Sequence, residues 1–247
     1  MSECAFCPHT GKLSAEHIAS AWMRELFPGR RTAWIQNDNM KERKTFETDS
    51  IDWTAKVVCE NCNNTWMSAI EGKHAKPALT PLITGQMDIP IDRSRAHSMA
   101  LFAFKTAVVL DHTQRFREPF FSKRIRYAFR QHLAIPNMVN MWFCGIKDHR
   151  GNGQFKSAYM KGDASPAEHF LMYVCTCAIG CFVFQVLAVT QIGNARFSPL
   201  GGFEGLGEPF FPSIRRGYIW PPRFALDGVS EFEAFADRWR NVVKIGD

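Results

Sequence analysis

The sequence lacks the features that mark secreted, repetitive and low-complexity proteins. Its first twelve residues, MSECAFCPHTGK, carry polar and thiol side chains where a signal peptide has an apolar run. Neither an internal repeat nor a low-complexity tract interrupts the 247 residues. Eight cysteines without a secretory signal indicate a reducing compartment, where thiols serve as metal ligands or buried side chains more often than as disulfides. We therefore expect a cytoplasmic protein.

A strong excess of one charge and a clear membrane-spanning run are also lacking. The formal charge of +6 is mild, and it is compatible with a nucleic-acid partner without requiring one. Residues 170–190 form an apolar run long enough to cross a bilayer. The run is rich in Val, Phe and Cys and contains Gly180 and Gln185, which favours two buried antiparallel strands joined near residues 178–181. We therefore expect no membrane association.

The apolar pattern divides the chain into an N-terminal module, residues 1–85, and an α+β domain with an antiparallel sheet, residues 86–247. The expected elements of the module are a helix over 15–27, a strand over 53–59 and a helix over 63–76. The second part is expected to contain helices over 95–113, 122–133 and 230–243, with strands separated by Gly, Pro and Asn turns between them. The sequence leaves open whether this part selects substrate, forms a homodimer or senses a signal.

Four cysteines form two pairs with the spacing of metal ligands. Cys4 and Cys7 stand three positions apart, as do Cys59 and Cys62. Each CxxC turn presents two thiolates and zinc takes four ligands, so the two turns predict one structural Zn²⁺ site. The 51 residues between the pairs exceed the usual finger spacing, and folded structure must therefore bring the halves together. A redox pair is the less favoured alternative. The remaining cysteines lie in apolar segments and are expected to be core residues: Cys144, Cys175, Cys177 and Cys181.

An acid and an imidazole lie side by side between the two thiol pairs, at Glu16 and His17, and Asn63 directly follows Cys62. This order of CxxC, acid-His, CxxC and Asn resembles the zinc-knuckle members of the HNH (ββα-metal, His-Me finger) endonuclease family. The resemblance covers roughly the first third of the chain. It implies a zinc-braced, treble-clef-like ββα-metal module in which His17 is the general base. It also implies that Glu16 and Asn63 hold one catalytic Mg²⁺ or Mn²⁺ ion.

Phosphodiester hydrolysis needs these groups, because a water must lose a proton to a base while a cation stabilises charge on the phosphate. Histidine suits the base role near neutral pH, and Glu and Asn oxygens suit Mg²⁺ or Mn²⁺. The sequence departs from the family pattern at Thr54, where the family usually has an asparagine, and at Met67, which is no ligand for a hard cation. Thr54, Asn64 and Glu71 are therefore the candidate supporting residues.

The expected function is a metal-dependent endonuclease acting on DNA. Several basic residues are candidates for contacts to the nucleic-acid backbone: Arg30, Arg31, Lys123, Arg124 and Arg126. The alternative is a non-catalytic zinc-binding module that binds nucleic acid or a protein. The two hypotheses share the four thiols and differ over the pair Glu16-His17 and over Asn63.

Overall fold

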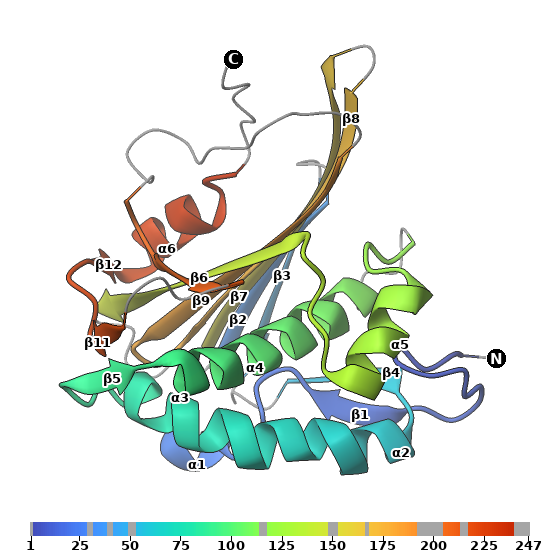
Figure 1. Ribbon diagram of the computed structural model, residues 1–247, viewed down its shortest axis with the longest axis horizontal. Helices are drawn as coiled ribbons and strands as arrows, with labels where there is room; N and C mark the ends of the chain where they lie inside the picture. Colours follow the sequence, from blue (N-terminus) through green and yellow to red (C-terminus); the bar gives the residue numbers. More distant parts are fainter. Residues whose placement is uncertain are drawn as a thin grey trace.

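A curved sheet organises the chain, and helices lie on both of its faces (Figure 1). The computed structural model describes residues 2–28, 32–38, 42–48, 53–113, 118–147, 153–165, 168–191, 205–212 and 217–239. Among these residues the sheet has eight strands in the order β10-β6-β9-β8-β7-β2-β3, with β12 paired to β6. The strands are β2 (Thr32–Asp38), β3 (Glu42–Thr48), β6 (Val139–Lys147), β7 (Gly153–Ser165), β8 (Glu168–Ile179), β9 (Phe182–Gln191), β10 (Glu208–Phe211) and β12 (Ala225–Asp227). Most pairs are antiparallel, which confirms the expected mixture of helices and antiparallel sheet.

Strands β8 and β9 are the two halves of the long apolar run. They pair antiparallel from Phe170 opposite Gln191 to Ile179 opposite Phe182, so the expected hairpin is confirmed. Gly180 occupies the turn with φ of 56°, a conformation that side chains with a Cβ atom rarely adopt. No helix in the described ranges is both long and apolar enough to cross a membrane.

The two faces of the sheet carry different helices because successive strand residues point to opposite sides. On one face, Phe184 packs against Phe102 of α4 (Arg93–His112), with ring centroids 6.0 Å apart. On the other face, the neighbouring Val183 packs with Phe235 of α6 (Gly228–Ala236). Figure 1 shows α4 beneath the sheet and α6 above it. Helix α4 is thus enclosed, and it separates the sheet from residues 2–28 and 53–83.

Residues 2–28 and 53–83 lie under α4 and form a strand pair followed by a long helical stretch, whereas β2 and β3 belong to the sheet. Strand β1 (Ser14–His17) pairs antiparallel with β4 (Thr54–Val58). The helical stretch runs in four segments: α2 (Glu60–Cys62), η1 (Asn63–Met67), η2 (Ile70–Ala75) and α3 (Lys76–Ile83). Two of these, η1 and η2, are π-helical, a form that often occurs at functional sites. The helix expected over residues 63–76 is therefore confirmed, and it is longer than expected.

The smaller elements complete this layer. Helix α5 (Lys123–His132) forms where a helix was expected over residues 122–133, and α4 forms where one was expected over residues 95–113. A second short strand pair joins β5 (Ile89–Ile91) to β11 (Tyr218–Trp220). The C-terminal helix α6 starts two residues before its expected start and ends at Ala236, earlier than expected.

The helix expected over residues 15–27 is wrong. Residues Ser14–His17 form β1, and only Met23–Leu26 form a helical turn, α1. The strand exists because β4, far along the chain, pairs with it, and the pairing continues where the amide of Ile18 donates to the Trp53 carbonyl at 2.9 Å. Tertiary pairing of this kind overrides local helix propensity.

One hydrophobic core joins the parts on either side of residue 85. Phe6, Met67, Phe102, Phe184 and Trp220 are all buried and belong to the same packed cluster. The boundary expected at residue 85 therefore crosses a shared core, with α4 as its centre.

Candidate metal centre and acid-histidine strand pair

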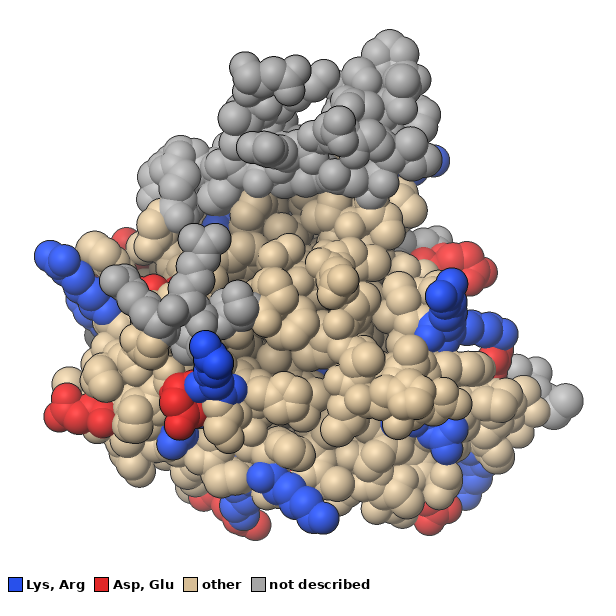
Figure 2. Space-filling model, in the orientation of Figure 1, with Lys and Arg blue, Asp and Glu red and all other residues tan. Residues whose placement is uncertain are grey.

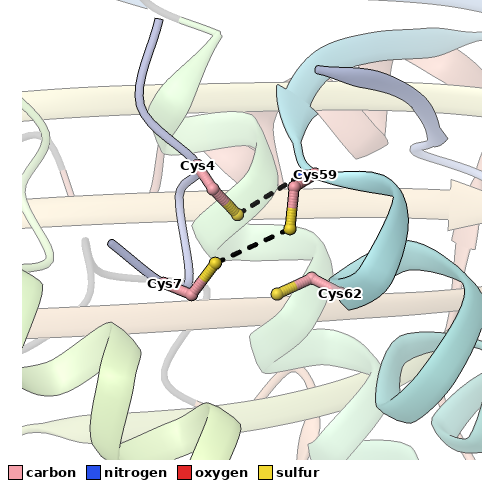
Figure 3. A group of neighbouring side chains, drawn as sticks. All are labelled: Cys4, Cys7, Cys59 and Cys62. Atoms are coloured by element: carbon pink, nitrogen blue, oxygen red, sulfur yellow. Dashed lines mark hydrogen bonds between the residues drawn. The ribbon is translucent and has the colours of Figure 1, made fainter. Parts of the chain in front are cut away.

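Four buried cysteines meet at one end of the β1–β4 pair (Figure 3). Their Sγ atoms all lie within 4.8 Å of one another, and those of Cys7 and Cys59 are 3.6 Å apart. Cys4 and Cys7 lie on the loop before β1, whereas Cys59 follows β4 and Cys62 lies in the first helical turn. The four side chains are thus positioned to hold a metal ion, as their spacing predicted. Four thiolates are the ligand set of a closed structural zinc site.

Backbone amides point at the sulfur of Cys4. The amide of Cys59 donates to Cys4 Sγ at 3.3 Å, and that of Phe6 donates to it at 3.5 Å. The neighbouring Cys62 thiol and these amides lower the pKa of Cys4 to about 4, against the opposing effect of burial. Hydrogen bonds of this kind favour the thiolate, which is the form that binds a metal.

Pairing of β1 with β4 brings the two thiol pairs together although 51 residues separate them in the sequence. In the β1–β4 register Ser14 lies opposite Val58 and His17 opposite Thr54, so the residues just before β1 and just after β4 reach the same end. The amide of Ala5 also donates to the Val57 carbonyl at 2.8 Å, which fixes the first thiol loop against β4. The intervening strands β2 and β3 extend away into the large sheet.

Glu16 and His17 are adjacent in β1 but lie in different environments. Glu16 is only 2% exposed, whereas His17 is half-buried at the end of the strand. The partner of His17 in the register, Thr54, is exposed. Alternation along the strand therefore directs the carboxylate into the interior and the imidazole to the opposite side.

The Glu16 carboxylate is bound by Lys105, a residue that sequence reasoning did not single out. Lys105 Nζ lies 2.6 Å from Glu16 Oε1 and 2.5 Å from Glu71 Oε1. Burial raises the pKa of Glu16, and the ammonium of Lys105 partly offsets this effect. Burial alone would lower the pKa of Lys105, but the two carboxylates together raise it above its ordinary value. The signal that could have identified Lys105 is its position as a single lysine inside the apolar stretch MALFAFKTAVVL.

Asn63 joins the start of the helix to β1. Its Nδ2 donates to Ser14 Oγ at 3.1 Å and to the Ala15 carbonyl at 3.2 Å. Of the candidate supporting residues, Glu71 is brought to Glu16 through Lys105, whereas Asn64 is exposed. Met67 is fully buried in the core.

Glu16, the acidic ligand predicted for a catalytic cation, does not fit one in this arrangement. The Glu16 side chain is only 3% exposed and its Oε1 contacts the Lys105 ammonium. A divalent cation bound to Glu16 would lie beside a fixed positive charge. Asn63 holds β1 through its amide nitrogen, and its uncharged side chain does not offset the repulsion between the Lys105 ammonium and a second cation.

The basic residues on α5 have two different roles. Arg126 is buried, and its guanidinium donates from Nε to the Phe121 carbonyl at 2.9 Å and from Nη1 to the Ala5 carbonyl. This placement replaces the surface role expected for Arg126, because the side chain fastens α5 to the first thiol loop. Lys123 and Arg124 are exposed, and Lys123 Nζ lies 2.7 Å from Glu3 Oε2. Arg30 and Arg31 lie outside the described residues.

Positive charge is dispersed on the face of the molecule shown in Figure 2. Lys and Arg side chains stand apart there, with Asp and Glu side chains between several of them. The described residues therefore form no continuous basic surface on this face.

No family model, curated protein or solved structure matches the chain. The geometry of the thiol cluster and of the β1–β4 pair is therefore the basis for a proposed function.

Proposed function

We propose that this protein is an HNH-type endonuclease that hydrolyses phosphodiester bonds in DNA, with His17 as the general base. One observation carries the proposal. The β1–β4 pair bears His17 at its end, and β4 leads through Cys59 directly into a helix that starts inside the second thiol pair. A strand pair followed by a helix, braced by four thiols, is the arrangement that the resemblance to this family implies.

The chain's own residues can perform one chemical task in this reaction. A neutral imidazole at His17 accepts a proton from the attacking water, which produces the nucleophile. Cys4, Cys7, Cys59 and Cys62 would hold a metal ion, which would tie the loop before β1 to the first helical turn and so fix the geometry. Mg²⁺ or Mn²⁺ would supply stabilisation of charge on the phosphate, but Glu16 as placed does not fit such an ion. No step of the proposed reaction is assigned to it.

The second candidate function is a zinc-braced module that binds nucleic acid or a protein without catalysis. The observation that favours it is the pairing of Glu16 with Lys105 at 2.6 Å in the interior. A carboxylate engaged in this way serves the fold, so the acid of the acid-His pair has no free role in hydrolysis.

A plasmid-cleavage assay separates the two functions. Zinc-loaded protein is incubated with supercoiled DNA in the presence of Mg²⁺, Mn²⁺ or EDTA, and a single-stranded RNA of similar length is tested in parallel. The endonuclease proposal predicts nicked or linear DNA that accumulates in proportion to protein concentration. Intact DNA in every arm, together with retarded migration of the DNA on a native gel, would support the binding module instead.

A further inference from the structure

Lys105 lies at the centre of the molecule with its charge entirely enclosed. Its side chain has 0% exposure, and it stands on α4 between buried apolar neighbours such as Phe104 and Ala107. Its ammonium also lies over the Phe102 ring, 5.6 Å from the ring centroid. A buried ammonium is strongly unfavourable unless anions surround it.

Two carboxylates from two other elements supply the compensating charge. Glu16 Oε1 comes from β1 at 2.6 Å, and Glu71 Oε1 comes from η2 at 2.5 Å. Glu16 is almost as deeply enclosed as Lys105, whereas the Glu71 side chain remains 18% exposed. One positive charge thus bridges two negative charges and connects α4, β1 and η2.

Two acidic oxygens that converge on one point are the usual setting for a divalent cation. Here the point is already occupied, because Mg²⁺ or Mn²⁺ would bind Glu16 Oε1 in the space that the ammonium fills. A cation at the second oxygen of the same carboxylate would be repelled by the ammonium beside it.

We propose that the ammonium of Lys105 is the resident cation beside the β1–β4 pair, with Glu16 and Glu71 as its ligands. In this arrangement Glu16 is not a metal ligand. It is a positioning residue that anchors β1 to α4 and thereby fixes the next residue, His17. The inference does not depend on hydrolysis, since it concerns only which cation the two carboxylates bind.

Binding of Mn²⁺ to the zinc-loaded protein tests the assignment directly. The wild-type protein and Glu16→Gln are titrated with Mn²⁺, and free Mn²⁺ is followed by electron paramagnetic resonance. Glutamine retains an oxygen that accepts a hydrogen bond from Lys105, and zinc content checks that the variant is folded. The two titrations should coincide. A Mn²⁺ site present in the wild type and absent in folded Glu16→Gln would overturn the proposal.

Thermal unfolding of Lys105 variants tests the same claim. Lys105→Met keeps the apolar stem and removes the charge, so two carboxylates are left unpaired, and the melting temperature should fall by on the order of 10 °C. Combining this change with Glu16→Gln and Glu71→Gln removes the stranded charges and should restore most of the loss. A Lys105→Met variant as stable as wild type would overturn the assignment. A triple variant that is no more stable than the single variant would also overturn it. If Lys105→Met does not fold, a triple variant that also does not fold overturns the assignment.

Lys156 provides a matched control elsewhere in the molecule. Its Nζ lies 2.7 Å from Asp237 Oδ2, and the Lys156 side chain is 5% exposed. Because this ammonium has one carboxylate partner among the described residues, against two for Lys105, Lys156→Met should lower the melting temperature less than Lys105→Met. A larger loss for Lys156→Met would contradict the special role of Lys105. None of these readouts uses nucleic acid, so failure here leaves the endonuclease proposal to its own assay.

Discussion

Single residues show how burial decides the role of a charged side chain. Glu16 and Arg126 belong to residue types that sequence reasoning assigns to ligands and to surfaces, yet both are buried and bound to internal partners. The partner of Glu16 stands 89 positions away in the sequence. Spacing alone identified the acid and the histidine, but it did not identify Lys105, because a lone lysine in an apolar helix has no local signature of its partner.

Arg126 should prove to be a structural residue. Arg126→Met leaves the carbonyls of Ala5 and Phe121 without their donor, and we expect a loss of about 1–3 kcal/mol in the free energy of unfolding. Urea denaturation measures this loss. The exposed neighbour Arg124 is the control, and Arg124→Met should leave the denaturation midpoint unchanged. Equal midpoints for the two variants would refute the structural role of Arg126.

At the scale of elements, local patterns predicted the pieces that are stabilised locally. The β8–β9 hairpin was predictable because an apolar run with a central glycine is characteristic of two strands and a turn. Strand β1 was not predictable, because its partner β4 lies beyond β2 and β3 in the chain. The thiol pairs were predictable from spacing, although their meeting depends on this same non-local pairing.

The turn between β8 and β9 is the most sensitive glycine position in the described residues. At Gly180 φ is positive, and an added Cβ would clash with the Ile83 carbonyl oxygen and lie 2.6 Å from Phe27 Cζ. Gly180→Ala should therefore cost about 2–4 kcal/mol of stability, from backbone strain and overpacking together. The measurement is the midpoint of chemical denaturation.

Gly72 offers the opposite case. It lies in η2, and an added Cβ would meet no atom within 4 Å. Gly72→Ala should stabilise the protein by about 0.5–1 kcal/mol, since alanine loses less conformational entropy in a helix. The account of the turn would be wrong if the two glycine variants shifted the midpoint in the same direction.

For the whole molecule, the main feature is a thiol cluster built into the hydrophobic cluster that also contains α4. Phe6, beside Cys7, packs edge to face on Trp66 with ring centroids 5.0 Å apart, and Trp66 packs on Phe129 of α5 at 5.6 Å. The thiol cluster is therefore continuous with the layer formed by α4 and α5. Sequence composition separated a thiol-rich module from the rest, and it could not show that the two share packing.

Removal of the metal should destabilise the whole molecule in one step. Scanning calorimetry of the zinc-loaded protein should show a single unfolding transition. Chelation of zinc, or Cys59→Ser, should move this entire transition to lower temperature, because metal binding contributes to folding free energy. Two transitions, of which only one responds to the chelator, would show that residues 1–85 unfold independently.

The most direct test of the central claim is the cleavage rate of His17→Ala measured beside its stability and zinc content. If His17 is the general base, the variant should bind zinc, melt near the wild-type temperature and cleave plasmid DNA roughly a hundredfold more slowly or worse. His9→Ala is the control, since His9 is an exposed histidine of the same module, and it should retain full activity. Full cleavage activity in a stable, zinc-loaded His17→Ala protein would contradict the account.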